Sequence, residues 1–206
     1  PVGYDAEDVF RINMTLMFNV LTAMERNGIE KMVFASSFSV LGLPFAPKPV
    51  EIGYFPVDEH HPQAPQDVYA VTKWLGEEMV EAWTRRTGHS AASIRMPWIQ
   101  TEKSFPEQVG PRRDREEAGL DLWAYIDARD AGRAFVQAAE ADIAGHERFF
   151  ISAADTYSER ETASLLDETY PAVERRTPLP GHTSLLSNDR AAELIGYAPE
   201  YGWRDY

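Results

Sequence analysis

Cysteine is absent from the 206 residues, which excludes disulfide bonds and thiolate metal sites. Basic residues are outnumbered by acidic ones, 20 to 33, and the formal net charge is −13. Non-specific nucleic-acid binding needs a basic surface, so we expect no nucleic-acid partner. No apolar run approaches the ~20 residues that cross a bilayer, and no basic, apolar leader precedes the first residues. We therefore expect a cytoplasmic protein without a membrane partner.

A glycine-rich turn between a first strand and a first helix is also missing. Doubly wound dinucleotide folds begin with such a turn, which receives the pyrophosphate. This sequence instead opens Pro1-Val2-Gly3 and passes directly into a helical pattern. If the fold is of this type, we expect its N-terminal strands, on the order of 80 residues, to be absent from the chain.

The first half of the chain alternates helical and strand patterns. Apolar residues recur at helical spacing through residues 6–27, and Gly28 follows as a stop. A short apolar strand is predicted over residues 31–35, a helix over 67–86 and a strand over 91–97. This alternation is typical of a parallel sheet with helices on its faces.

The second half is less regular. Residues 101–118 are charged and contain Pro106, Gly110 and Pro111, so we predict a loop or lid there. Ser158 and Glu161 form a capping-box pattern that predicts the start of a helix towards Tyr170. The other predicted elements are a strand at 123–126, a helix at 130–139, a strand at 148–152 and a helix at 187–195.

Tyr69 and Lys73 lie four residues apart in the predicted helix over residues 67–86, so they share one face. An ammonium group beside a phenol stabilises the phenolate and lowers the tyrosine pKa from ~10. Such a tyrosine can exchange a proton with a hydroxyl or carbonyl group. A tyrosine and a lysine at this spacing are common by chance, so the pair alone is a weak signal.

Flanking segments make the signal specific. Before the pair, the strand Val33-Phe34-Ala35 ends in Ser36-Ser37, and after it Ile94-Arg95-Met96-Pro97-Trp98-Ile99 leaves the sheet. Chemistry in α/β sheets sits at the carboxyl ends of the strands. Together with Tyr125-Ile126-Asp127-Ala128-Arg129-Asp130-Ala131, these segments resemble the extended short-chain dehydrogenase/reductase family, which includes sugar epimerases and dehydratases.

The resemblance implies an α/β fold: a Rossmann-like doubly wound parallel sheet, with its N-terminal strands absent from this chain, and a small C-terminal α/β substrate lobe. Residues 1–100 would form the C-terminal half of the Rossmann-like domain and carry the catalytic residues. Residues 101–206 would mostly form the substrate lobe, with residues 121–152 returning to the main sheet.

Site roles follow from the resemblance one residue at a time. Tyr69 would be the general acid/base, Lys73 would lower its pKa and bind the nicotinamide ribose, and Ser37 would hold the reacting oxygen. Asn13 would sit near the cofactor, and Pro97 to Ile99 would line the nicotinamide pocket. The implied cofactor is NAD or NADP, and the residue that chooses between them lies in the missing part.

Departures from the family pattern concern the substrate. Phe38 and Ser39 stand where a sugar-nucleotide dehydratase needs an acidic pair, and Trp123 stands where many nucleotide-sugar enzymes carry arginine. A smaller, uncharged or carboxylated sugar-like substrate is therefore favoured. Ser39, Trp98 and Trp123 are the candidate substrate residues.

Other polar residues have simpler interpretations. His60 and His61 adjoin two acidic residues, but adjacent loop residues rarely converge on one ion, so no metal site is predicted. Arg112, Arg113 and Arg115 could meet an anionic substrate if their loop closes, although a solvated loop is the favoured interpretation.

The leading hypothesis is an NAD(P)-dependent oxidoreductase acting on a secondary alcohol or ketone of a sugar or sugar derivative. One alternative is an NAD-dependent sugar or nucleotide-sugar epimerase, and another is a non-catalytic binding or regulatory member of the fold. By resemblance, a homodimer is expected through the helices at residues 6–27 and 67–86.

Overall fold

A computed structural model describes residues 3–113 and 116–206. Its main sheet is parallel and has three strands in the order β1, β3, β6. These strands are β1 (Lys31–Ala35), β3 (Ser90–Arg95) and β6 (His146–Phe150). Strand β3 is in the centre, with Ala35 beside Ile94 and Arg95 beside Phe150. The carboxyl ends of β1 and β3 therefore meet at one edge of the sheet.

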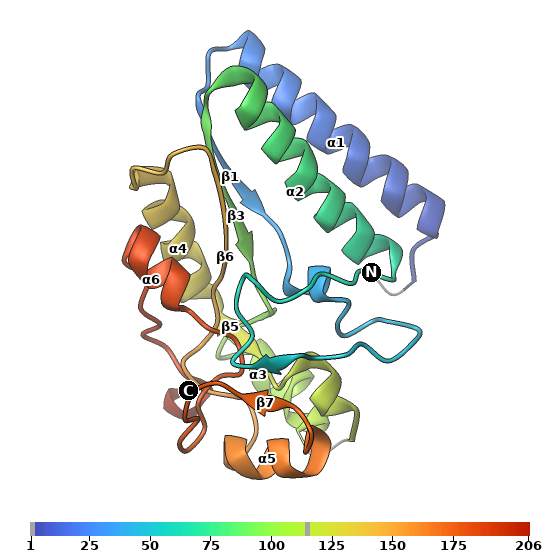
Figure 1. The fold of residues 1–206 in the computed structure, drawn as a ribbon, viewed down its shortest axis with the longest axis vertical. Helices are drawn as coiled ribbons and strands as arrows, with labels where there is room; N and C mark the ends of the chain where they lie inside the picture. The colour runs from blue at the N-terminus through green and yellow to red at the C-terminus, as the bar shows by residue number, and fades with distance from the viewer. Residues whose placement is uncertain (1–2, 114–115) are drawn as a thin grey trace.

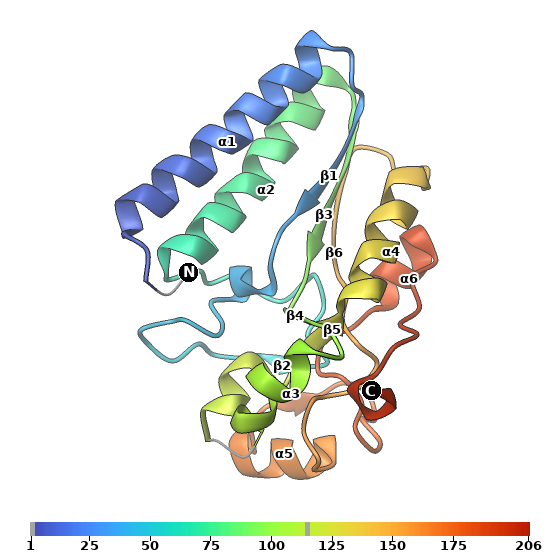
Figure 2. The same cartoon turned by 180° about the vertical axis from the view of Figure 1, so that it is seen from behind.

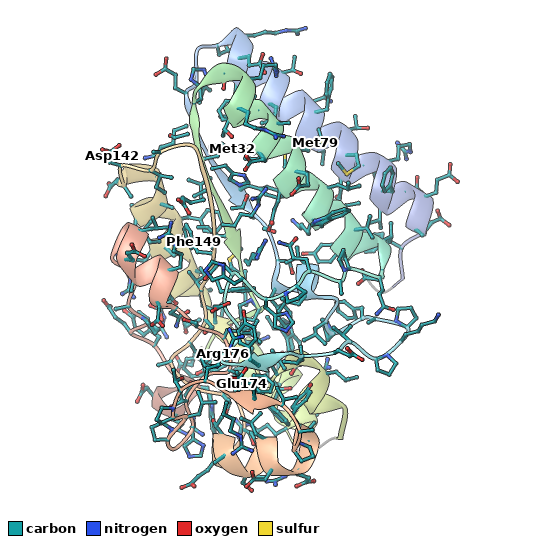
Figure 3. All side chains as sticks on the ribbon, in the orientation of Figure 1. Met32, Met79, Asp142, Phe149, Glu174 and Arg176 are labelled. Carbon is teal, nitrogen blue, oxygen red and sulfur yellow. The ribbon has the colours of Figure 1, made fainter. Side chains whose placement is uncertain are left out.

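Helices cover both faces of the main sheet (Figures 1 and 2). On one face lie α1 (Ala6–Arg26) and α2 (Val68–Thr87), and on the other lie α4 (Ala128–Glu140) and α6 (Asp189–Ile195). Met32 belongs to the core between the sheet and the first pair of helices, and Met79 of α2 packs against that core, whereas Phe149 belongs to the core on the opposite face (Figure 3). The result is a three-layer α/β arrangement of the Rossmann type.

Local capping sets the ends of α2, the longest element beside the site. The Asp67 side chain accepts a hydrogen bond from the Ala70 amide at 3.0 Å, which satisfies one free donor of the first turn. Gly88 ends the helix with φ of 75°, a left-handed conformation that glycine adopts without strain. Both boundaries agree with the sequence-based prediction to within one residue.

A smaller lobe follows the carboxyl ends of the main strands (Figures 1 and 2). Two parallel two-stranded sheets form it: β2 with β7, and β4 with β5. The strands are β2 (Tyr54–Phe55), β7 (Glu174–Arg175), β4 (Trp98–Gln100) and β5 (Tyr125–Asp127). Helices α3 (Ser104–Gln108) and α5 (Thr162–Thr169) complete the lobe.

Three predictions need correction. The segment over residues 101–118 is not simply a loop, because it contains α3 and the 3₁₀ helix Gly110–Arg112. The part of residues 121–152 that returns to the main sheet is α4 and β6, whereas β5 pairs with β4. The capping box at Ser158 does not form, because its hydroxyl accepts from the Arg160 amide and α5 begins at Thr162.

Within residues 3–113 and 116–206, no helix combines the length and the apolar character that a membrane span requires.

Candidate active site

The serine cluster follows β1 directly and turns sharply. Ser37 caps the 3₁₀ helix Phe38–Leu41, and its hydroxyl accepts from the Ser39 amide at 3.1 Å. Gly42 ends this helix with φ of 96°, and a Cβ there would lie 2.4 Å from the Ala64 carbonyl oxygen. Only glycine fits this position, so the turn holds Ser37 at the carboxyl end of β1.

Tyr69 and Lys73 lie in the first two turns of α2, the helix that packs beside β1 and β3. The Lys73 ammonium group is 5.5 Å from the centre of the Tyr69 ring and 5.3 Å from that of Phe34. Its Nζ donates a 2.7 Å hydrogen bond to the Ala35 carbonyl at the end of β1. The helix and the strand end thus place the pair beside the serine turn.

One cavity of about 620 Å³ brings the candidate residues together. Its size is within the usual range for small-molecule sites. It is lined by Ala35, Ser36, Ser37, Phe38, Pro44, Phe45, Tyr69, Lys73, Met96, Pro97, Trp98, Ile99, Arg112 and Asp121. Six of the nine candidate site residues are among them, namely Ser37, Tyr69, Lys73, Pro97, Trp98 and Ile99, and so is Arg112.

Three other candidate residues are not on this wall. Ser39 is 1% exposed and Trp123 is 4% exposed, and Trp123 belongs to the hydrophobic core of the small lobe. Neither side chain lines the cavity, so neither is placed to contact a substrate in it. Asn13 donates a 2.9 Å hydrogen bond to Thr72 and lines two adjoining hollows, one shared with Tyr69 and one with Lys73.

The protonation of the pair differs from the simple expectation. Burial raises the pKa of Tyr69 above its ordinary value, while its interaction with the Ser37 hydroxyl lowers it in part. Burial lowers the pKa of Lys73. The ammonium group faces the ring of Tyr69 and bonds to Ala35, so Lys73 does not hold the phenol as a phenolate in this arrangement.

A buried ion pair lies behind the serine turn. Glu77, one turn after Lys73 on α2, accepts hydrogen bonds from the Arg95 guanidinium at 3.0 and 2.7 Å. The same carboxylate accepts from the Ser36 hydroxyl at 2.5 Å. Glu77 and Arg95 are 0% and 1% exposed. The pair links α2, β1 and β3 next to Ser37, and sequence reasoning missed it.

A second polar chain lies away from the cavity. Ser93 contacts His146 at 2.7 Å, and His146 contacts Glu81 at 3.1 Å, in the order of a serine-histidine-acid triad. Ser93 is 0% exposed, and none of the three residues lines the cavity. Burial lowers the pKa of His146, which keeps the ring neutral. The chain therefore ties α2 to the sheet and has no access to a substrate.

The histidine pair in the loop before α2 does not form a cluster with other ligands. His61 is 3% exposed, and its Nε2 accepts from the Gly53 amide at 3.0 Å. Among the residues that the structure describes, no group of three or more His, Asp or Glu side chains is arranged to hold a metal ion. Arg115 lies outside the described residues.

Comparison with known proteins identifies the family. Residues 3–151 match the NAD dependent epimerase/dehydratase family, so the chain belongs to it. A short-chain dehydrogenase/reductase superfamily protein from Agrobacterium tumefaciens, solved with bound NAD, has the same fold with a TM-score of 0.67 at 20% identity. The match covers 97% of this chain and 71% of that protein.

Two curated relatives are more similar in sequence over a shorter stretch. A putative UDP-glucose 4-epimerase from Methanocaldococcus jannaschii is 35% identical over 47% of this chain and 29% of its own length. A uronate dehydrogenase from Pseudomonas syringae pv. tomato is 31% identical over 52% of this chain and 34% of its own length. The aligned stretches thus cover about a third of the length of these relatives.

Proposed function

We propose that this chain carries the proton-transfer site of an NAD(P)-dependent oxidoreductase that acts on a secondary alcohol or ketone of a sugar or sugar derivative. The observation that carries the proposal is the shared cavity, which is lined by Ser37, Tyr69 and Lys73 together with Pro97 to Ile99. The uronate dehydrogenase among the relatives supports net oxidation.

The residues present fit the nicotinamide-ribose end of a dinucleotide. Lys73 is a half-buried cation that has no carboxylate partner among the described residues, and its Nζ donates a hydrogen bond to the Ala35 carbonyl. An ammonium group has three donors, so others are free for ribose hydroxyls. Met96 and Pro97 add an apolar surface suited to a flat ring. When bound, the nicotinamide supplies the hydride acceptor or donor.

The side chains divide the remaining work. Ser37 hydrogen-bonds the reacting oxygen of the substrate and fixes its distance from Tyr69. In reduction, the Tyr69 phenol gives its proton to that oxygen; in oxidation, the Tyr69 phenolate takes the proton back. Burial raises the pKa of Tyr69 and so favours the phenol, the form that donates in reduction. Oxidation needs the phenolate, and Lys73 on the same helix face is the cation placed to stabilise it. Trp98 closes the apolar side of the cavity.

An epimerase is the alternative, supported by the epimerase among the relatives. The purified protein should be incubated with NAD or NADP and a panel of sugars. An oxidoreductase accumulates reduced nicotinamide in proportion to oxidised sugar. An epimerase interconverts two sugars, visible by NMR, with no net change in nicotinamide absorbance. If neither occurs with any sugar, the non-catalytic alternative replaces both.

The exposed surface of α1 bears on how the chain assembles. Helix α1 has five large apolar side chains that stay exposed in the described part of the chain: Phe10, Ile12, Leu16, Phe18 and Val20. We propose that α1 and α2 pack against the same pair in a second copy, and that the boundary between the two domains lies near residue 100. Light scattering after size exclusion tests the dimer, and a monomeric mass contradicts it.

A further inference from the structure

A second hollow adjoins the catalytic cavity. Its volume is about 490 Å³, and the start of α1 supplies most of its lining, including Val9, Ile12 and Asn13. Phe45 and Tyr69 line this hollow and also line the catalytic cavity. The two aromatic side chains therefore form the wall that the two spaces share. The proposed chemistry accounts for Tyr69 in this wall but gives Phe45 no role.

Neighbouring residues hold Phe45 in place. It lies in the irregular segment that follows the serine turn. Leu43 and Ile52 of this segment are buried in the hydrophobic core of the small lobe. The Gln66 side chain donates a 3.2 Å hydrogen bond to the Lys48 carbonyl. The segment is thus anchored on both sides of Phe45, which is itself 47% exposed, so its ring is set at the shared wall by its neighbours rather than by its own burial.

The second hollow offers a mainly apolar surface. Its apolar lining includes Val9, Ile12 and the ring of Phe45. Asp8, the charged residue of the lining, already accepts a 2.5 Å hydrogen bond from Arg11. An uncharged, apolar group fits this lining, because burying a charge without a partner is costly.

We propose, resting on the function proposed above, that Phe45 is a specificity-determining residue whose ring divides the two spaces and limits the substrate to a sugar without a bulky apolar substituent. A sugar whose reacting oxygen contacts Ser37 and Tyr69 occupies the catalytic cavity, and a large substituent on it meets the Phe45 ring. Replacing this ring by a methyl group joins the two spaces. The apolar lining from α1 then becomes available to the substituent.

Titration calorimetry on the purified chain tests this without requiring turnover. The probes are phenyl glucoside and 6-O-benzyl glucose, which carry an aromatic ring at opposite ends of the sugar, with methyl glucoside and 6-O-methyl glucose as their small counterparts. In wild type we expect each aromatic probe to bind no more tightly than its small counterpart. In Phe45→Ala at least one aromatic probe should gain about tenfold or more relative to its counterpart, because its ring is buried in the joined space.

Two further variants control for indirect effects. Phe45→Leu keeps an apolar side chain of smaller size and should give a smaller gain than Phe45→Ala. Phe10→Ala is the matched control, because Phe10 is 43% exposed on α1 and lines neither space, so it should keep the wild-type ratio of affinities. Circular dichroism confirms that all three variants are folded.

The inference is overturned if the ratio of affinities is the same in wild type and Phe45→Ala, or if Phe10→Ala shifts it equally. Absence of saturable binding of all four probes removes both the inference and the proposed function. Turnover of a sugar with an unchanged ratio leaves the proposed function standing and removes the role of Phe45. A shifted ratio without turnover of any sugar does the reverse.

Discussion

The buried Glu77–Arg95 pair offers the sharpest test of how the site is held. Glu77→Gln keeps the size of the side chain but removes its charge. Arg95 is then a cation that is 1% exposed and has no carboxylate in direct hydrogen-bond contact. Removing one partner of a buried ion pair typically costs roughly 3–5 kcal/mol. The bond from Ser36 to Glu77 is also weakened, which loosens the turn that carries Ser37.

Urea unfolding followed by tryptophan fluorescence measures this loss. Glu78→Gln is the matched control, because Glu78 is the next residue on α2, its side chain is 50% exposed, and it contacts Arg148 at 3.2 Å. Exposed pairs contribute about 0–1 kcal/mol, so the control should change stability little. The double variant Glu77→Leu with Arg95→Met should be more stable than Glu77→Gln, because no buried charge is left unpaired.

The reasoning is refuted if Glu77→Gln and Glu78→Gln lower the free energy of unfolding by similar amounts. It is also refuted if the double variant loses as much free energy of unfolding as Glu77→Leu and Arg95→Met lose when added together, since that would mean the two charges are not coupled.

Three further outcomes are expected. Burial raises the pKa of Asp121 to about 6, so the contribution of this carboxyl group to the free energy of unfolding is present below about pH 4 and is lost as the pH rises to about 6. Asparagine does not ionise, so the free energy of unfolding of Asp121→Asn relative to wild type should rise by up to about 3 kcal/mol between pH 4 and pH 7. A parallel pH dependence of the two proteins contradicts this. Gly42→Ala should destabilise the protein by about 1 kcal/mol or more, because φ is 96° there and the new Cβ would lie 2.4 Å from the Ala64 carbonyl oxygen. Gly132→Ala, where a Cβ meets open space, should be neutral or stabilising. Thermal melting measures both variants, and equal effects contradict the steric argument. In NMR of labelled tyrosine without dinucleotide, Tyr69 should titrate above the ordinary tyrosine pKa because burial raises it, and a lower value would show that Lys73 already controls it.

Sequence patterns predicted the main layers well because those signals are local. The helical period of α1, the apolar run of β1 and the caps of α2 at Asp67 and Gly88 each act within a few residues. The parallel arrangement followed from their alternation. The proximity of Ser37, Tyr69 and Lys73 follows from the same frame, since strand ends and the start of the next helix meet at one edge of a parallel sheet.

The small lobe could not be predicted in the same way. Strands β2 and β7 are two residues each and pair across a long stretch of sequence, so neither carries a periodic signal. Trp123 was a reasonable pocket candidate by residue type, but long-range packing buries it in the core. Aromatic character alone does not distinguish a pocket wall from a core.

The buried pair of Glu77 and Arg95 could have been predicted from the sequence. Glu77 repeats the spacing of Tyr69 and Lys73 along α2, and Arg95 is the one charged residue of β3, at its carboxyl end. Two opposite charges on buried faces predict a pair, because an isolated buried charge is too costly. Arg112 lines the cavity and Arg113 does not, and this difference had no such signal, since adjacent residues in an irregular segment point in directions that only the tertiary fold decides.

The central claim is that Tyr69 moves the proton in dinucleotide-dependent oxidation. The most direct measurement compares the rate of nicotinamide reduction by wild type, Tyr69→Phe and Tyr54→Phe with the best sugar of the panel. Tyr54 bonds to Asp58 in the small lobe and does not line the cavity, so its variant controls for loss of a hydroxyl elsewhere. The account predicts a loss of about 10²-fold or more in Tyr69→Phe alone. Equal rates in the two variants would contradict it.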